Sequence, residues 1–414
     1  MMNVGILTLL TATVLCAADE ERLALVLRAQ TDFERVVLSP AASLHDTNVC
    51  VQTQASVIPI ATPEEAPVFQ FRKGYCALAA SLVTKEPNGY LQAAWAFDQA
   101  IAAWPARNLF FAKKRPPEPL PSILPVLASV ARLKAGKGDV KQIADAVNAR
   151  VCNDALIATN ACDGILQAGR EWLGWDALQR ADFDSAAREF PATAAAWKSW
   201  VDGKRAFRDR RYPDAVTAYR RSVEAWETRS KNSMPMRERL GPPVDLSVAY
   251  TELGGAQLLA AKPADALVSL NQAVRYDSTN ARALFLRARA QDAAGRTDAA
   301  IADYGLAARS ALAKTNEGAS AEAHVYRGIA FYRRKDFARA EDEFTNALNF
   351  EIDPAVRADA VAWRRLAAVA SGSCEAGRKY LEEALPAASP FFPREEARAT
   401  IASCGTASTA QRSR

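Results

Sequence analysis

Small residues recur at fixed positions along this chain, and their spacing limits the possible folds more than any other feature. Five positions, called markers below, are each followed after four residues by a large apolar residue and after seven residues by a small one. The step from Ala266 to Ala300 is the basic unit, and the longer steps contain inserted loops. The markers are Ala215, Ala266, Ala300, Ala340 and Gly377. A period of this length is typical of a repeat architecture.

The repeated unit is predicted to be a pair of helices. In 281–313 apolar residues recur every three or four positions, which is the helical period, and a break at Gly295 separates two helices. In four of the five units a small residue also lies twelve positions before the marker. Small residues let two antiparallel helices cross closely, and the large residue after the marker fills the remaining space. A lone hairpin leaves an apolar face uncovered, so the pattern predicts an all-α solenoid of stacked antiparallel hairpins.

The spacing of Tyr250, Leu253, Gly254 and Ala266, combined with the marker pattern, resembles tetratricopeptide (TPR) repeats. The resemblance implies a TPR-like α-solenoid, here expected over 166–388, whose first helices line a concave groove that holds a partner. It thus favours a protein that binds another protein or an extended peptide.

Two further segments carry weaker forms of the repeat. Residues 89–105, within a unit expected over about 74–107, place Ala93 and Phe97 at the marker spacing. Residues 173–190 supply Ala186 and Phe190, but the step from Ala186 to Ala215 is shorter than the basic unit. This second segment is predicted to be a shortened repeat.

The remaining sequence is less regular. A helical region is expected over 19–112, interrupted by an irregular loop at 40–68, and a proline-rich connector with helices is expected over 113–165. The C-terminal segment, 389–414, is expected to end in a disordered tail.

The first residues predict export. Residues 4–18 form a short apolar run, and Cys16 and Ala18 stand at the −3 and −1 positions of a signal-peptide cleavage site after residue 18. The run has no Lys or Arg before it, so a buried first helix is the alternative. We expect a periplasmic or secreted protein without a transmembrane span in the mature chain.

Six cysteines remain after the predicted leader, and they fall into three pairs that are close in sequence. An even number of cysteines in an exported chain favours disulfides, and short loops close at the lowest entropic cost. Six unrelated buried thiols are the alternative. The expected pairs are Cys50–Cys76, Cys152–Cys162 and Cys374–Cys404.

Residues that could carry catalysis are scarce. The chain has only two histidines, His45 in an expected loop and His324 inside an expected helix, and no Cys/His cluster has zinc-ligand spacing. Sequence motifs of nucleotide-binding loops, hydrolases and metalloproteases are missing. We therefore predict no metal, no cofactor and no enzymatic activity. An enzyme with its site within 1–165 is the minor alternative.

Positive charge concentrates in one segment. Residues 197–240 contain 12 Lys and Arg against six Asp and Glu, while the whole chain carries a net charge of only +5, which does not suggest nucleic acid. Interleaved aromatic residues suit an acidic peptide partner. A solvated repeat edge with ordinary core aromatics is the alternative reading of this segment.

The predicted partner-binding residues are those that the TPR resemblance places on the groove side of the first helices. They are Trp197, Trp200, Lys204, Phe207, Arg208, Arg282, Phe285, Arg289, Val325, Ile329, Tyr332 and Arg333. The predicted function is a protein-binding scaffold or adaptor in the cell envelope. A purely structural component of an envelope assembly is the alternative.

Overall fold

The chain is helical in every regular element that the structure describes. The computed structural model describes residues 17–38, 42–111, 119–153, 156–231, 239–389 and 392–411, so most of the predicted leader lies outside the described residues. Among the described residues we find no helix with the length and apolar character needed to cross a membrane. The chain divides into two compact units, Met1–Val201 with Glu227–Pro243, and Asp202–Trp226 with Val244–Arg414.

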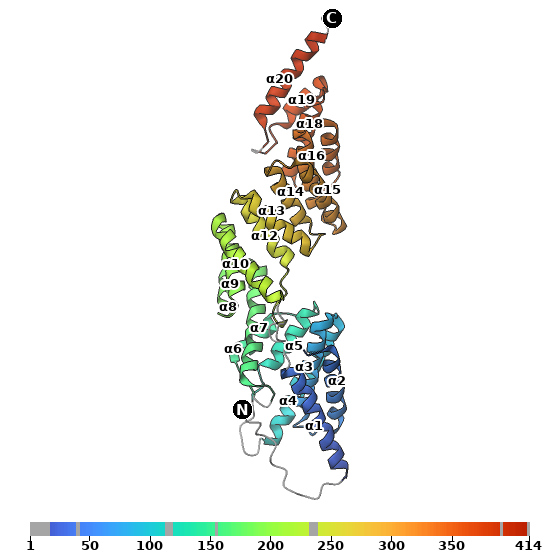
Figure 1. Ribbon diagram of the computed structural model, residues 1–414, viewed down its shortest axis with the longest axis vertical. Helices are drawn as coiled ribbons and strands as arrows, with labels where there is room; N and C mark the ends of the chain where they lie inside the picture. The colour runs from blue at the N-terminus through green and yellow to red at the C-terminus, as the bar shows by residue number, and fades with distance from the viewer. Residues whose placement is uncertain are drawn as a thin grey trace. The chain divides into compact units, whose positions relative to one another are not determined.

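Unit 1 consists of consecutive helices that pack on their neighbours in chain order (Figure 1). They are α1 (Ala17–Leu38), α2 (Leu44–Val57), the 3₁₀ turn η1 (Ile58–Ile60), α3 (Ala66–Thr84), α4 (Pro87–Phe111), α5 (Ile123–Lys134), α6 (Lys141–Ala149), α7 (Thr159–Gln179), α8 (Phe183–Glu189) and the first half of α9 (Ala195–Arg208). One hydrophobic core runs from Phe33 to Trp172 and includes the fully buried Phe71 and Phe97.

Helix α2, the turn η1 and the start of α3 lie in the segment that was predicted to be an irregular loop, so that prediction was wrong. The inward face of α2 is built from Thr47, Cys50, Gln54 and Val57, which follow helical spacing but are mostly polar. A search for apolar periodicity overlooks such a face. The Ser43 hydroxyl accepts a hydrogen bond from the Asp46 amide and completes a capping box, which fixes the start of the helix.

Unit 2 is an array of helical hairpins. It contains the rest of α9, most of α10 (Tyr212–Lys231), α12 (Leu246–Leu259), α13 (Pro263–Tyr276), α14 (Ala281–Ala293), α15 (Thr297–Ala313), α16 (Glu317–Arg333), α17 (Phe337–Leu348), α18 (Pro354–Ala370), α19 (Cys374–Ala384) and α20 (Arg394–Gln411). Each helix from α12 to α19 packs on the next, and first helices also contact first helices, as α12 with α14 and α14 with α16. This arrangement confirms the predicted solenoid of stacked hairpins.

The helix crossings explain the small residues of the repeat. At Gly254, a Cβ atom would lie 2.5 Å from the Leu270 Cγ, and at Gly328 it would lie 2.7 Å from the Phe344 ring. In both hairpins the crowding residue is the large one four positions after the marker. The same pairing of the −12 glycine with the +4 residue occurs at Gly174–Phe190 and Gly203–Tyr219.

In each of two successive hairpins of unit 2, an ion pair joins the first helix to the second. Arg287 of α14 donates two hydrogen bonds to Asp303 of α15, at 2.6 and 2.8 Å. In the next hairpin Arg327 lies 3.2 Å from Glu343, which also lies 2.8 Å from the His324 Nδ1. Each arginine stands thirteen positions before its marker and each acid stands three after it, so the pair is part of the repeat.

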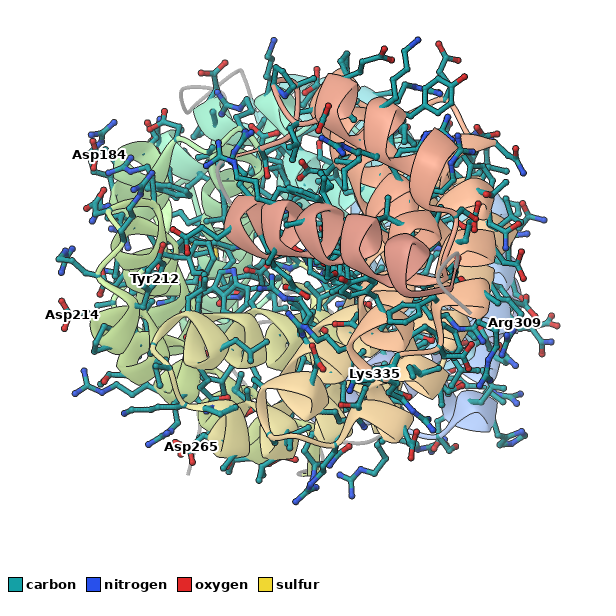
Figure 2. The ribbon with its side chains drawn as sticks, turned by 90° about the horizontal axis from the view of Figure 1, so that it is seen from above. Asp184, Tyr212, Asp214, Asp265, Arg309 and Lys335 are labelled. Carbon is teal, nitrogen blue, oxygen red and sulfur yellow. A yellow bond between two sulfur atoms is a disulfide. The ribbon has the colours of Figure 1, made fainter. Side chains whose placement is uncertain are left out.

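The second helices present charged side chains to solvent. Asp214, Asp265 and Arg309 are exposed on α10, α13 and α15, and their side chains point outward in Figure 2. These residues alternate with the buried markers, as expected for amphipathic helices with one face on the core.

Helix α20 reaches further than predicted. It continues to Gln411, into the segment expected to be a disordered tail. Ala397 and Ile401 are buried and anchor the helix on its neighbours.

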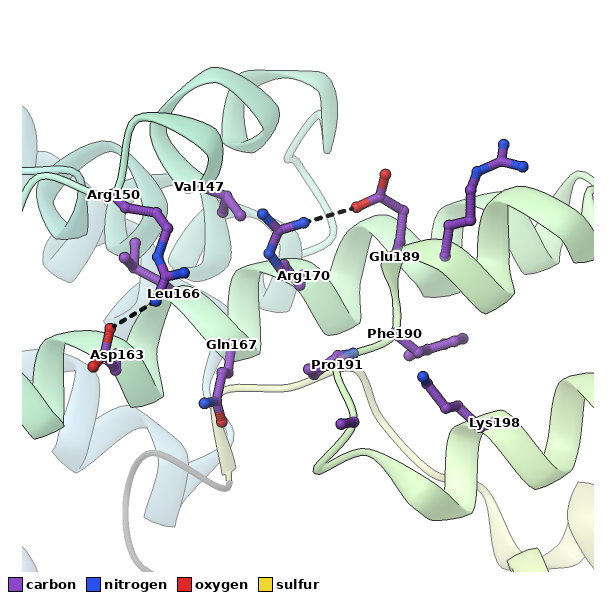
Figure 3. Close-up of a pocket in the computed structure, with 12 residues that line it drawn as sticks. Val147, Arg150, Asp163, Leu166, Gln167, Arg170, Glu189, Phe190, Pro191 and Lys198 are labelled. Atoms are coloured by element: carbon purple, nitrogen blue, oxygen red, sulfur yellow. Dashed lines mark hydrogen bonds and ion pairs between the residues drawn. The ribbon is translucent and has the colours of Figure 1, made fainter.

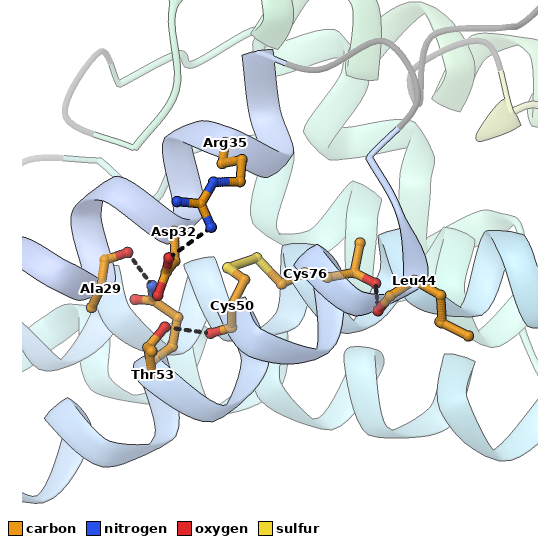
Figure 4. The surroundings of a disulfide bond; sticks show 9 residues. Ala29, Asp32, Arg35, Leu44, Cys50, Thr53 and Cys76 are labelled. Atoms are coloured by element: carbon orange, nitrogen blue, oxygen red, sulfur yellow. Dashed lines mark hydrogen bonds and ion pairs between the residues drawn. A yellow bond between two sulfur atoms is a disulfide. The ribbon is translucent and has the colours of Figure 1, made fainter.

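Two of the three predicted disulfides are present in unit 1. Cys50 of α2 bonds to Cys76 of α3, and Cys152 bonds to Cys162 of α7. Figure 4 shows the first bond between neighbouring helices. Nearby, the Gln54 amide donates to the Ala29 carbonyl at 2.6 Å, which ties α1 to α2. The predicted pair Cys374–Cys404 lies outside the described side chains.

Peptide mapping without reduction is expected to recover the two bonds of unit 1 as intramolecular links in protein produced in an oxidising compartment. Cys50 and Cys76 lie on helices that pack together, and Cys152 lies in the short segment that leads into the helix of Cys162, so native pairing needs no rearrangement. The same mapping tests the Cys374–Cys404 prediction. Recovery of Cys50 and Cys76 as alkylated free thiols would contradict the structure.

Candidate functional site

The first helices of unit 2 form a continuous row because α12 contacts α14, α14 contacts α16, and α16 contacts α18. We define the first-helix face as the positions 18, 15, 11, 8 and 7 residues before each marker. All of the predicted partner-binding residues occupy these positions. The structure shows which of them solvent can reach.

Most aromatic and aliphatic members of the predicted set are buried. The Phe285 ring lies 5.7 Å from the Tyr304 ring and 5.2 Å from the Tyr326 ring, so it links its own hairpin to the next one. Trp197 lies in unit 1 and stacks on Phe190 at 5.3 Å. The buried members are Trp197, Trp200, Phe285, Val325 and Tyr332, whereas Phe207 and Ile329 are half-buried. These side chains pack between helices, and they expose little surface that a partner could contact.

The accessible members of the predicted set are arginines. Arg208, Arg282, Arg289 and Arg333 are exposed. The Arg289 guanidinium lies 5.3 Å from the centre of the Tyr326 ring, and that of Arg282 lies 5.9 Å from the centre of the Phe285 ring. Rings beneath these cations hold them in place by cation–π attraction while leaving their charges accessible.

Two apolar residues of the first-helix face were missed by the sequence analysis. Val248 and Leu259 of α12 are 46% and 49% exposed, and they stand 18 and 7 residues before the marker Ala266. The signal is present in the sequence, because the offset −18 gives Arg282 in the next hairpin and the offset −7 gives Arg333 in the one after it. Helix α12 contacts α14, so these apolar residues adjoin the helix that carries Arg282 and Arg289.

Several cations of the basic segment lie beside acids. Lys204 lies 3.2 Å from Glu252 of α12, and Arg208 lies 3.0 Å from Asp209. Arg211 lies 2.7 Å from Asp214. Residues 232–238, which include Arg237, lie outside the described part of the chain. The two cations of this segment that were predicted to bind a partner, Lys204 and Arg208, are therefore already paired with acids.

Tyr332 and Arg333 line a pocket of about 430 Å³ in unit 2. Trp363 and Phe337 form its aromatic wall, with ring centres 5.4 and 5.3 Å from the Tyr332 ring. Burial, followed by the nearby Glu396 carboxylate, raises the pKa of Tyr332 to about 12. Arg333 also pairs with Asp292 of α14. Tyr332 therefore stays a neutral phenol at physiological pH and anchors α20 to the array.

The structure confirms the predicted helical position of His324 but not the predicted loop position of His45. His45 is exposed in the first turn of α2 and not in a loop. His324 belongs to the interhelical ion-pair network with Glu343. Within the described ranges, no group of three or more His, Cys, Asp or Glu side chains could hold a metal ion.

Comparison with protein-family models and with curated proteins gives no match. Among solved structures the chain is similar to MamA (17% identity, 47% of this chain and 91% of that one, TM-score 0.37). It is also similar to yeast Tom70 (14% identity, 95% and 97%, TM-score 0.37). A STAND-family signal transduction ATPase with a tetratricopeptide repeat sensor, from Pyrococcus horikoshii, has 15% identity over 95% of this chain and 67% of that one, with a TM-score of 0.44.

The hairpins of this chain are tetratricopeptide-like repeats. They share the marker spacing, and the −12 glycine packs against the +4 residue in Gly254–Leu270 and Gly328–Phe344.

Proposed function

We propose that this array of tetratricopeptide-like hairpins is a non-enzymatic scaffold of the cell envelope that binds an acidic, partly apolar segment of a partner protein. The observation that carries the proposal is the composition of the first-helix face on α12 and α14. Exposed Val248 and Leu259 stand on one helix, and exposed Arg282 and Arg289 stand on the adjoining one. Exposed apolar side chains beside cations are a feature of protein-binding surfaces.

The charges on this face favour an acidic partner. Arg282 and Arg289 rest on aromatic rings and lie on a helix that adjoins exposed apolar area. Their attraction for carboxylates would raise the association rate, while Val248 and Leu259 would contribute contact area once the partner docks. Exposed charges are screened over about 8 Å at physiological salt, so binding should weaken as salt rises.

The envelope location is supported by two independent features. The first residues have the pattern of a cleaved leader. The bonds Cys50–Cys76 and Cys152–Cys162 are of a kind that persists in oxidising compartments and is rare in the cytosol.

A non-enzymatic role is supported by the structural roles of the buried polar side chains in unit 2. The most buried acids of unit 2, Asp303 and Glu343, are taken up by ion pairs between helices. His324, the one histidine in a protected position, is part of the same network. These groups hold hairpins together.

The proposal is tested by capture of partners from envelope extract with the mature chain, followed by titration of the captured partner. We expect Arg282→Glu/Arg289→Glu to weaken binding by at least about tenfold and to remove most of its salt dependence. Arg309→Glu, which reverses an exposed charge on the second helix α15, is the matched control and should bind as the parent does. Val248→Asp should also weaken binding, because it places an acid in the apolar contact.

The same titration separates this face from the basic segment predicted from the sequence. Lys204→Glu/Arg208→Glu should have the smaller effect, because Glu252 and Asp209 already neutralise these cations. If the Arg282/Arg289 variant binds as well as the parent while the Lys204/Arg208 variant does not, the binding surface lies on α9 and the proposal is wrong.

A further inference from the structure

The shortened repeat of unit 1 leaves space where other hairpins have a helix. Ala186 and Ala215 stand closer together in sequence than the markers Ala266 and Ala300, which define the basic unit. The missing length comes from the second helix, since α8 ends at Glu189, three residues after its marker, whereas α13 continues ten residues past Ala266. Phe190 has extended backbone angles (φ −62°, ψ 123°) and precedes Pro191, which disfavours a helical conformation there.

A pocket of about 450 Å³ occupies this place, wholly within unit 1 (Figure 3). Its walls come from the end of α6, from α7, from the end of α8 with the following loop, and from the start of α9. Phe190 and Leu166 are buried beneath it, and Pro191 and Ala192 give it an accessible apolar part. Its volume lies within the range of about 300–1,000 Å³ that is usual for small-molecule sites.

The side chains around the pocket carry more positive charge than negative charge. Four cations (Arg150, Arg170, Arg188 and Lys198) face two carboxylates (Asp163 and Glu189). Both carboxylates are already engaged, Asp163 by Arg150 at 3.4 Å and Glu189 by Arg170 at 3.5 Å. These two pairs are drawn as dashed lines in Figure 3.

Two cations of the pocket therefore form no ion pair among the described residues, although the pKa of Asp182 is lowered first by hydrogen bonds from Ser185 and, to a lesser extent, by the charge of Arg188. Arg188 donates to the Ser185 hydroxyl at 2.9 Å and forms no ion pair with any carboxylate in the described ranges. Lys198 likewise forms no ion pair there, and its side chain extends toward Phe190 in Figure 3. An uncompensated ammonium group beside an aromatic ring is suited to an anion that also has an apolar part.

We propose that this pocket binds an organic carboxylate, with the carboxylate group on Lys198 and Arg188 and an apolar portion against Pro191 and Ala192. A carboxylate presents two oxygens to these two cations. A compact inorganic anion such as phosphate would leave the apolar wall uncovered. This site lies on unit 1 and is independent of the partner surface proposed on unit 2.

The walls of the pocket are held in place before any ligand binds. The bond Cys152–Cys162 ties the segment after Arg150 to the first turn of α7, next to Asp163. Gly169 packs against Val147 and Ile143, so α6 and α7 are closely apposed behind the pocket. A preformed site costs a ligand less ordering entropy than a mobile one.

Titration of the full chain with hexanoate, monitored by ligand-observed NMR, tests the proposal. We expect saturable binding in the millimolar range, and at least about fivefold weaker binding in Lys198→Gln and in Arg188→Gln, each of which removes one cation. Lys141→Gln, at an exposed lysine of α6 outside the pocket, is the matched control and should bind as the parent does. Circular dichroism would confirm that all variants are folded.

Three further probes define the ligand. Hexanamide, which lacks the charge, and inorganic phosphate, which lacks the apolar part, should each bind at least about fivefold more weakly than hexanoate. A capped peptide with one glutamate between two leucines distinguishes the source of the carboxylate: tighter binding than hexanoate indicates an acidic side chain of a protein, and weaker binding indicates a free organic acid. Hexanamide or phosphate binding as well as hexanoate, absence of any hexanoate binding, or unchanged affinity in both cation variants would overturn the proposal.

Discussion

Replacing Asp303 with alanine is expected to lower the free energy of unfolding by about 3 kcal/mol. The two Arg287–Asp303 hydrogen bonds join α14 to α15, and the Asp303 side chain is only 7% exposed. Removing the acid leaves a largely buried guanidinium without its partner, which usually costs about 3–5 kcal/mol. The lower end applies because the Arg287 side chain keeps 19% of its surface exposed.

Urea denaturation of three variants distinguishes the net contribution of the ion pair to stability from the cost of leaving one of its charges unpaired. Arg287→Met/Asp303→Leu removes both charges and should change stability by no more than about 1 kcal/mol, since apolar residues of similar size can replace a buried pair. Asp176→Ala breaks the exposed Arg180–Asp176 pair, and it should cost no more than about 0.5 kcal/mol. If Asp303→Ala is as mild as Asp176→Ala, the pair contributes no more than a surface contact.

The architecture of unit 2 was predictable because its packing is encoded locally. A small residue twelve positions before the marker and a large one four after it must meet at the crossing, and they do at Gly328–Phe344. The interhelical ion pairs follow the same logic. Their offsets of −13 and +3 give Arg287–Asp303 and Arg327–Glu343, so the sequence already contained them.

The first half of unit 1 was harder to predict because its helices do not show the expected signals. Helix α2 buries Thr47 and Gln54, and polar residues on an inward face erase the apolar period. In the α3–α4 hairpin the glycine that meets Phe97 is Gly74, nineteen residues before Ala93 instead of twelve. The seven extra residues correspond to about two helical turns, which preserve the crossing while breaking the sequence register.

Sequence offsets could place residues on the first-helix face, but they could not show which ones solvent reaches. Phe285 and Arg282 both belong to that face, yet Phe285 is 5% exposed because Tyr304 and Tyr326 enclose it. Enclosure depends on the neighbouring hairpin, whose side chains lie far away in sequence. The pocket at Lys198 escaped prediction for the same reason. Shortening of α8 was visible as a short step between repeats, but the cations that gather there come from four segments.

Two adjacent glycines of α12 provide a sharp test of the helix crossing, because they differ only in what surrounds them. A Cβ atom at Gly254 would lie 2.5 Å from the Leu270 Cγ and 2.8 Å from its Cδ2, and Leu270 is fully buried. A Cβ atom at Gly255 would lie 3.4 Å from the Leu286 side chain, its nearest neighbour. The first distance is a clash, whereas the second is an ordinary contact.

Gly254→Ala is expected to be about 1–3 kcal/mol less stable than Gly255→Ala in urea denaturation, because only the first change overpacks the crossing. Both variants gain the same helix propensity, about 1 kcal/mol for replacing glycine by alanine inside a helix, so this gain cancels in the comparison. Gly255→Ala should therefore match or exceed the parent in stability. Ala340→Leu overpacks another crossing and should be destabilising by a similar amount. Equal stability of the two glycine variants would show that α12 and α13 do not cross at Gly254, and the marker register of the whole array would then be wrong.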